Sequence, residues 1–204
     1  MKVLGISTSP RPDGNSERLL RRALEGAESA GADVECIRLA GLKIGPCVEC
    51  NSCRQTGLCR LDDDYRWLLE KISRADRLIF ATPIFFMGPC AQAKMLIDRG
   101  QCLWARKYVL KKGPAAQSAD RRAMVIAVGG SRSKKQFDCI RLTMKAYFDS
   151  LETCYAANLF VNQVDELGQI ERHPRAMAEA FRLGAELASS DSKPPRAPIE
   201  VELY

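Results

Sequence analysis

Short apolar runs alternate with stretches of helical spacing along the chain, and this alternation limits the folds that the sequence can adopt. The apolar runs predict strands over residues 2–7, 33–39, 77–81, 123–128 and 154–161. The intervening periodicity predicts helices over residues 16–30, 65–73, 90–110, 135–151 and 174–188, the third broken near Gly100. Strands separated by helices favour a parallel sheet covered on both faces, and right-handed crossovers make a doubly wound sheet the natural closure. We therefore expect an α/β fold with a doubly wound five-stranded parallel sheet.

Length and charge exclude several classes of protein. At 204 residues one domain is the default, and we expect it over residues 1–188, with a cysteine-rich loop at 45–60, a surface loop at 111–120 and a C-terminal tail at 189–204. The net charge of +6 comes from scattered Lys and Arg without a nucleic-acid motif, so no nucleic-acid partner is expected. No apolar run of about 20 residues is present to span a membrane. The first residues enter a strand without a signal-peptide pattern, so a cytoplasmic location is expected.

The segment between the first strand and the first helix predicts an anion site. The first N–H groups of a helix lack partners, and the helix dipole attracts negative charge to them. Polar side chains with donors surround this position, and two prolines stiffen the loop, which suits one phosphate monoester; the candidates are Ser7, Ser9, Arg11, Gly14, Asn15 and Ser16. The loop lacks the glycine pattern of dinucleotide sites and the Gly-Lys-Ser/Thr ending of triphosphate sites. An ordinary capped strand-to-helix turn remains an alternative.

Two further loops follow strands three and four, at the same edge of the predicted sheet. The first is unusually apolar for a loop and consists of Thr82, Pro83, Ile84, Phe85, Phe86, Met87, Gly88 and Pro89. It either packs against the protein or a second subunit, or it walls a flat aromatic ligand. The second, with Gly129, Gly130 and Ser131, permits close backbone approach from the other side. A phosphate cup, an apolar wall and a glycine loop together describe a flavin mononucleotide (FMN) site.

The order of these motifs resembles the flavodoxin-like NAD(P)H-dependent FMN reductase superfamily. The resemblance covers roughly residues 1–188 and rests on Ser9-Pro10-Arg11-x-x-Gly14-Asn15-Ser16, Thr82 to Phe86 with Ala91-Gln92-x-Lys94 and Ile97-Asp98-Arg99, and Gly129-Gly130. It implies that Ser9, Arg11, Asn15 and Ser16 hold the FMN phosphate, that Pro83 through Gly88 line the isoalloxazine, and that Gly129–Ser131 close the far side. Lys94 and Asp98 instead have the i,i+4 spacing of a helix-surface ion pair.

Four of the nine cysteines lie in the spacing Cys47-x2-Cys50-x2-Cys53-x5-Cys59. In a reducing compartment such a group points to metal or redox chemistry, and four thiolates commonly hold an iron–sulfur cluster. The spacing resembles the iron–sulfur flavoprotein branch of the same superfamily, which implies a [4Fe-4S] cluster beside FMN. A four-cysteine zinc site, a disulfide pair and an empty reduced loop are the alternatives. Acidic residues 62–64 are expected to complement the dipole of the helix that follows.

These features predict an FMN-dependent oxidoreductase that moves electrons between a carrier, a [4Fe-4S] cluster and FMN, with no catalytic side chain of its own. The electron donor would be NAD(P)H or a ferredoxin-like protein, and the acceptor a small molecule. Two alternatives are a cluster-free NAD(P)H-dependent flavin or quinone reductase and a non-catalytic FMN- or metal-binding redox sensor. The apolar wall and the resemblance also imply a homodimer or homotetramer.

Overall fold

The fold was analysed in a computed structural model, which describes residues 1–113, 120–189 and 194–204. Six parallel strands lie in the order β2-β1-β3-β5-β6-β7, and β4 pairs antiparallel with β3. The strands are β1 (Lys2–Ser7), β2 (Asp33–Arg38), β3 (Arg77–Phe85), β4 (Gly88–Pro89), β5 (Arg122–Val128), β6 (Cys154–Val161) and β7 (Ile199–Leu203). Strands β2, β1, β3, β5 and β6 have the flavodoxin-like order, so the predicted fold class is confirmed. The sheet has two strands more than expected, β4 and β7.

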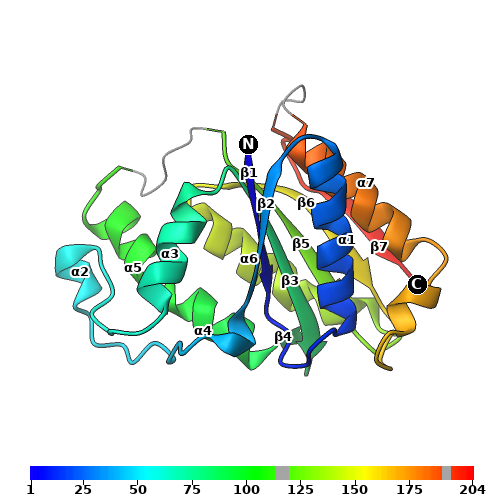
Figure 1. Ribbon diagram of the computed structural model, residues 1–204. Coiled ribbons are helices and arrows are strands. Elements are labelled where there is room, and N and C mark those ends of the chain that lie inside the picture. Colours follow the sequence, from blue (N-terminus) through cyan, green and yellow to red (C-terminus); the bar gives the residue numbers. More distant parts are fainter. Residues whose placement is uncertain (114–119, 190–193) are drawn as a thin grey trace.

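Helices cover both faces of the sheet (Figure 1). α1 (Asn15–Ser29) and α7 (Ala176–Ala188) lie on one face. The other carries α3 (Tyr65–Arg74), α4 (Ala91–Arg99), α5 (Gln101–Trp104) and α6 (Asp138–Ser150). The remaining elements are α2 (Cys53–Thr56), a π-helical turn over Ala105–Val109, and 3₁₀ turns over Leu39–Gly41, Lys134–Phe137 and Gln169–Arg172. The predicted helix over 90–110 is interrupted at Gly100, as expected.

Alternation along the strands divides the core into two layers. Val3 packs with α1 and α7, whereas its neighbour Leu4 packs with α3, α4 and α6. On β3, Ile79 likewise belongs to the layer of α1 and α7, and Phe80 belongs to the layer of α3, α4 and α6. Successive strand side chains point to opposite faces, so a continuous apolar run can supply both layers.

Two predicted boundaries are corrected by the structure. The segment 82–89 is not a free loop, because β3 continues through Phe85 and turns back into β4. The tail at 189–204 contains β7, whose residues pair with β6 from Ala157 to Val161. Residues 190–193 of that tail, and residues 114–119 of the predicted loop at 111–120, lie outside the described part of the chain.

Helices α1 and α7 approach so closely that glycine is required where they cross. A Cβ on Gly26 would lie 2.0 Å from the Phe181 carbonyl oxygen, and one on Gly184 would lie 1.9 Å from that of Ala23. We therefore expect Gly26→Ala to lower the free energy of unfolding by about 1–3 kcal/mol, because the helices must separate to admit the methyl group. Gly41→Ala is the matched control, since no atom lies within 4 Å of that position. Urea denaturation of both variants measures the difference, and equal stability would show that the helices separate at little cost.

Candidate functional site

The loop between β1 and α1 presents backbone donors at the carboxyl edge of the sheet. The first bond of α1 runs from the Arg18 N–H to the Gly14 carbonyl (3.0 Å), so the N–H groups of the first turn have no helical acceptor. The Ser9 hydroxyl fixes the loop by accepting from the Arg11 N–H (3.2 Å) and donating to the Arg11 carbonyl (3.0 Å). A Cβ on Gly14 would lie 2.7 Å from Ser9 Oγ, so this loop needs glycine there.

Three predicted loops meet around one cavity of about 150 Å³ at this edge. It is lined by Ser9, Pro10, Arg11, Gly14, Asn15, Ser16, Pro83, Ile84, Phe85, Val128, Gly129, Gly130, Val164 and Asp165. The order of strands reverses between β1 and β3, and ligands of doubly wound sheets bind at that point. Val164 and Asp165 were not predicted, although they follow β6 as the other loops follow their strands.

Some side chains that were predicted to bind the ligand form hydrogen bonds within the protein instead. Ser7 is the last residue of β1 and donates its hydroxyl to the buried carboxylate of Glu17 (3.2 Å). The Asn15 amide donates to the Glu166 carbonyl (2.8 Å), and its oxygen accepts from the Ile170 N–H (3.3 Å). Asn15 therefore offers the cavity its backbone more readily than its side chain. Ser131 does not line the cavity: its hydroxyl accepts from the Ser133 N–H (3.0 Å).

The β3–β4 hairpin ends in a strained, apolar tip. Phe86 is fully exposed, and Met87 is about half exposed. Neither of them, nor Gly88, lines the cavity, whereas the preceding Phe85 does. Phe86 and Met87 have φ values of 47° and 65°, the left-handed region that two-residue hairpin turns usually fill with Asn and Gly. Such strain in large apolar residues often accompanies a function.

We expect the double substitution Phe86→Asn, Met87→Gly to raise the free energy of unfolding by about 1–2 kcal/mol, because both new residues tolerate positive φ. Chemical denaturation of a monomeric, cofactor-free sample measures this. Leu142→Gln is the control, since it removes an exposed apolar side chain from α6 without relieving backbone strain. A double variant no more stable than this control would show that the turn carries no strain.

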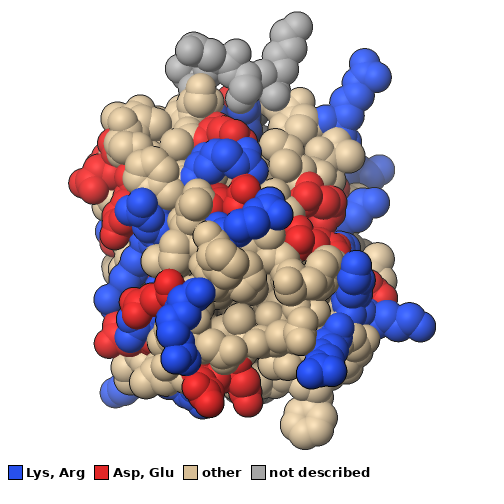
Figure 2. Space-filling view, turned by 90° about the vertical axis from the view of Figure 1, so that its right-hand side faces the viewer, with Lys and Arg blue, Asp and Glu red and all other residues tan. Residues whose placement is uncertain are grey.

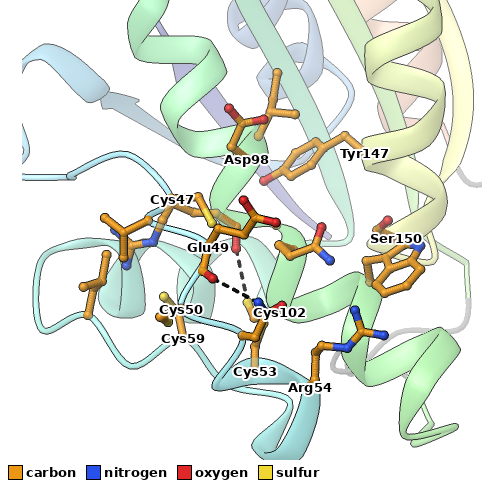
Figure 3. Close-up of a pocket in the computed structure, with 18 of the residues that line it drawn as sticks. Cys47, Glu49, Cys50, Cys53, Arg54, Cys59, Asp98, Cys102, Tyr147 and Ser150 are labelled. Carbon is orange, nitrogen blue, oxygen red and sulfur yellow. Dashed lines mark hydrogen bonds between the residues drawn. The ribbon is translucent and has the colours of Figure 1, made fainter.

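A second, larger cavity lies beside the cysteine loop. It has a volume of about 600 Å³ and is lined by residues 47–51, 53, 54 and 59–61 of the loop together with residues of α4, α5 and α6. Its wall includes all four predicted ligands: Cys47, Cys50, Cys53 and Cys59 (Figure 3). Burial raises the pKa of the Cys53 thiol, and the neighbouring Cys47, Cys50 and Cys59 raise it further.

The four loop thiols border a space rather than a point. In the part of the chain that the structure describes, no three His, Cys, Asp or Glu side chains are grouped tightly enough to hold a single metal ion. A cluster differs from a single ion because each thiolate binds its own iron at the periphery. The donor set, with the four loop cysteines and the buried Cys102 around one large cavity, therefore fits an iron–sulfur cluster better than a mononuclear zinc ion.

A buried ion pair fastens both ends of the cysteine loop to α4. Arg99 donates to both carboxylate oxygens of Asp63 (2.6 and 3.0 Å) and to the Gly45 carbonyl (3.0 Å). Asp63 also accepts from the N–H groups of Gly45 (3.0 Å) and Tyr65 (3.1 Å). Burial opposes ionisation of Asp63, but these hydrogen bonds outweigh it and lower its pKa. Sequence reasoning assigned Asp63 only to the helix dipole and did not find Arg99 as its partner.

Two buried donors in the wall of this cavity have no partner. They are Arg99 Nε and the Tyr147 hydroxyl, the only such side-chain atoms among the described residues. Figure 3 shows the Tyr147 hydroxyl directed into the cavity. The pKa of Arg99 is raised: burial opposes this, but Asp63 and the nearby Cys59 thiol favour the charged form. The predicted ion pair of Lys94 with Asp98 is confirmed at 2.7 Å on the rim.

The fold and the two cavities define a flavodoxin-like protein with a small crevice at the switch point of its sheet and a larger cysteine-lined chamber beside the cysteine loop. Comparison with known proteins agrees: residues 1–154 match the NADPH-dependent FMN reductase family, and the chain belongs to this family. Family membership indicates a flavin-dependent oxidoreductase that uses FMN.

Curated relatives confirm the predicted branch. An iron–sulfur flavoprotein of Methanocaldococcus jannaschii is 40% identical over 136 residues, which are 67% of this chain and 66% of the relative. One of Methanosarcina thermophila is 35% identical over 136 residues, or 67% of each chain. The matched part thus spans about two thirds of these relatives.

Solved structures confirm the fold. An NAD(P)H:quinone oxidoreductase from Methanothermobacter marburgensis aligns with a TM-score of 0.70 and 17% identity, covering 95% of this chain and 98% of that one. A flavone reductase aligns with a TM-score of 0.68 and 23% identity, covering 97% and 66%. Within residues 1–113, 120–189 and 194–204, no helix has the length and apolar character to cross a membrane.

Proposed function

We propose that this chain is an FMN-dependent oxidoreductase that passes electrons between a carrier, a [4Fe-4S] cluster held by Cys47, Cys50, Cys53 and Cys59, and FMN. The observation that carries the proposal is the single cavity lined by all four cysteines and by two unpartnered buried donors. When bound, FMN supplies hydride and electron chemistry and the cluster supplies one-electron transfer. The protein contributes binding, orientation and electrostatics.

In this proposal the crevice at the β1–β3 switch point binds FMN. The unpaired N–H groups at the start of α1 and the Arg11 guanidinium bind the phosphate, with Ser9 and Gly14 shaping the loop. Pro83, Ile84 and Phe85 wall the ring, and Gly129 and Gly130 allow close approach from the other side. All five residues line the crevice. The hairpin tip extends this wall with Phe86, Met87 and Gly88.

Arg11→Ala should raise the Kd for FMN about 10- to 100-fold, because a hydrogen bond from a charged donor to phosphate is worth about 1.5–3 kcal/mol. Quenching of flavin fluorescence during titration of the apoprotein measures the Kd. Arg22→Ala is the control, because Arg22 packs over the Phe181 ring of α7 and does not line the crevice. Unchanged affinity in the Arg11 variant would remove this residue from the FMN site.

The electron donor is a nicotinamide or an electron-carrier protein. Arg54 and Arg60 line the cysteine cavity and favour an acidic, ferredoxin-like carrier over an uncharged one. Elsewhere the charges are mixed: on the side of α1 and α7, acidic and basic side chains alternate without a continuous basic stripe (Figure 2). Steady-state assays with NADPH, NADH and reduced ferredoxin test the proposal. Turnover with reduced ferredoxin supports it, and its absence with all three donors supports a non-catalytic redox sensor.

A second candidate function is a cluster-free NAD(P)H-dependent flavin or quinone reductase. The family description and the fold shared with a quinone oxidoreductase favour it. It predicts NAD(P)H turnover with a small-molecule acceptor and no dependence on the four cysteines.

Assembly into a homodimer or homotetramer is supported by the exposed, strained tip at Phe86 and Met87. An apolar tip that keeps an unfavourable backbone fits a contact with a second copy of the chain. Light scattering should give a multiple of the chain mass for the wild type and a lower mass for Phe86→Asn, Met87→Gly. A monomeric wild type would contradict this assembly.

A further inference from the structure

The unpartnered donors of Arg99 and Tyr147 indicate that the cavity wall does more than hold a cluster through its cysteines. Buried side-chain polar atoms in folded proteins nearly always have a hydrogen-bond partner, because an unpaired one carries a desolvation penalty. Here the only two exceptions among the described residues come from different helices, α4 and α6, and line the same cavity. The Arg99 side chain interacts with the thiol of Cys59, a proposed cluster ligand, whereas Tyr147 has no acceptor at all, which indicates that a ligand of this chamber supplies sulfur or other acceptors to both donors.

The chemistry of the two groups defines that ligand. Arg Nε can only donate, and a phenol keeps its proton at neutral pH and can donate it. The ligand must therefore present at least two acceptors inside a chamber lined by five thiols, the four of the cysteine loop and that of the buried Cys102. The sulfur atoms of an iron–sulfur cluster, both thiolate and sulfide, are such acceptors, and hydrogen bonds to them tune its reduction potential.

The surrounding structure holds both donors in place. Asp63 engages both terminal nitrogens of Arg99, which leaves Nε as the free edge of the guanidinium. The Tyr147 ring packs against Gly100, the residue between α4 and α5, where an added Cβ would lie 2.9 Å from Tyr147 Cε2. Glycine at position 100 thus lets the ring approach the wall of the chamber.

We propose that Arg99 Nε–H and the Tyr147 hydroxyl donate hydrogen bonds to sulfur atoms of the bound cluster and raise its reduction potential. This inference rests on the proposed function, since it needs the cluster in the four-cysteine cavity. Added positive charge and hydrogen bonds stabilise the reduced, more negative state more than the oxidised one.

Tyr147→Phe tests the inference, because it removes only the hydroxyl. In protein purified without oxygen, iron and FMN content should stay at the wild-type level. An EPR-monitored redox titration should show the equilibrium for cluster reduction weakened about tenfold, which for one electron is a fall of about 59 mV. Tyr155→Phe is the matched control, because the Tyr155 hydroxyl donates to Asn158 on β6, away from the cavity. The reduction potential of the cluster in this variant should equal that of the wild type.

The cluster-free chain gives a second readout. Because the Tyr147 hydroxyl lacks a protein partner, Tyr147→Phe should leave the melting temperature of the apoprotein unchanged or raise it. A clear fall would reveal a protein partner and overturn the inference. An unchanged potential with full iron content would also overturn it while leaving the proposed function intact. A wild-type protein that takes up no iron would refute both.

Discussion

Asp63→Ala is expected to lower the free energy of unfolding by about 3 kcal/mol at neutral pH, the largest loss of stability that we predict for a single substitution. The reason is the state in which it leaves Arg99, whose side chain is fully buried and would lose both carboxylate contacts. A buried charge without its partner costs more than the pair contributes. Asp98→Ala is the control, because its pair with Lys94 is exposed on both sides and worth little.

The effect of Asp63→Ala should depend on pH with a defined sign. The folded-state pKa of Asp63 is lowered, so the stability it provides is present above the ordinary carboxyl pKa of about 3.9. That stability is lost as the pH falls from about 3.9 through the lowered folded-state value. Urea unfolding at pH 7 and pH 3 should therefore show a larger difference between wild type and variant at pH 7. A difference independent of pH would contradict an ionised Asp63 in the folded protein.

Cys59→Ser is expected to have the largest effect on cofactor content, with a fall of at least about tenfold in bound iron and retention of FMN. A [4Fe-4S] cluster needs four thiolates, and Cys59 is a half-buried cysteine beside Arg99; the other cysteine on this side of the cavity, Cys102, is buried and donates its thiol hydrogen to the Arg99 carbonyl (3.3 Å). The proposed FMN site is the other cavity, whose lining contains no cysteine. Iron and flavin are measured on the same anaerobically purified sample.

Cys139→Ser serves as the control for Cys59→Ser, because Cys139 is an exposed cysteine on α6 that does not line the four-cysteine cavity. Its iron content should equal that of the wild type. If iron persists in the Cys59 variant, this residue is not a ligand, and the proposed ligand set fails.

Much of the fold could be predicted because its cause is local. The apolar runs that form β1, β3 and β5 are buried on both faces, and the helices between them carry clear periodicity. β7 was missed because Ile199–Leu203 lies at an edge with alternating glutamates, which resemble a solvated tail. Its stabilising contacts are tertiary: Glu200 and Glu202 both pair with Arg141 on α6.

The candidate site was predictable only in part, for the same reason. The crevice loops and the four cysteines have characteristic spacing, so their residue types and order were sufficient. Two features of the cavity could not be read from the spacing of the cysteines: the Asp63–Arg99 pair and the Tyr147 hydroxyl. Arg99 and Tyr147 belong to α4 and α6, which are distant from the cysteine loop in the sequence, and only the packing of these helices brings them to the cavity. The hairpin tip at Phe86 and Met87 contains no Gly or Asn, so turn chemistry could not reveal it.

The central claim is that this chain holds FMN and a four-cysteine iron–sulfur cluster together. The most direct measurement is the visible spectrum of protein purified without oxygen, with iron and acid-labile sulfide assayed on the same sample. We expect flavin bands over a broad iron–sulfur absorption, with about four irons per chain. Flavin bands without iron or sulfide would contradict it and leave a simple NAD(P)H-dependent flavin or quinone reductase.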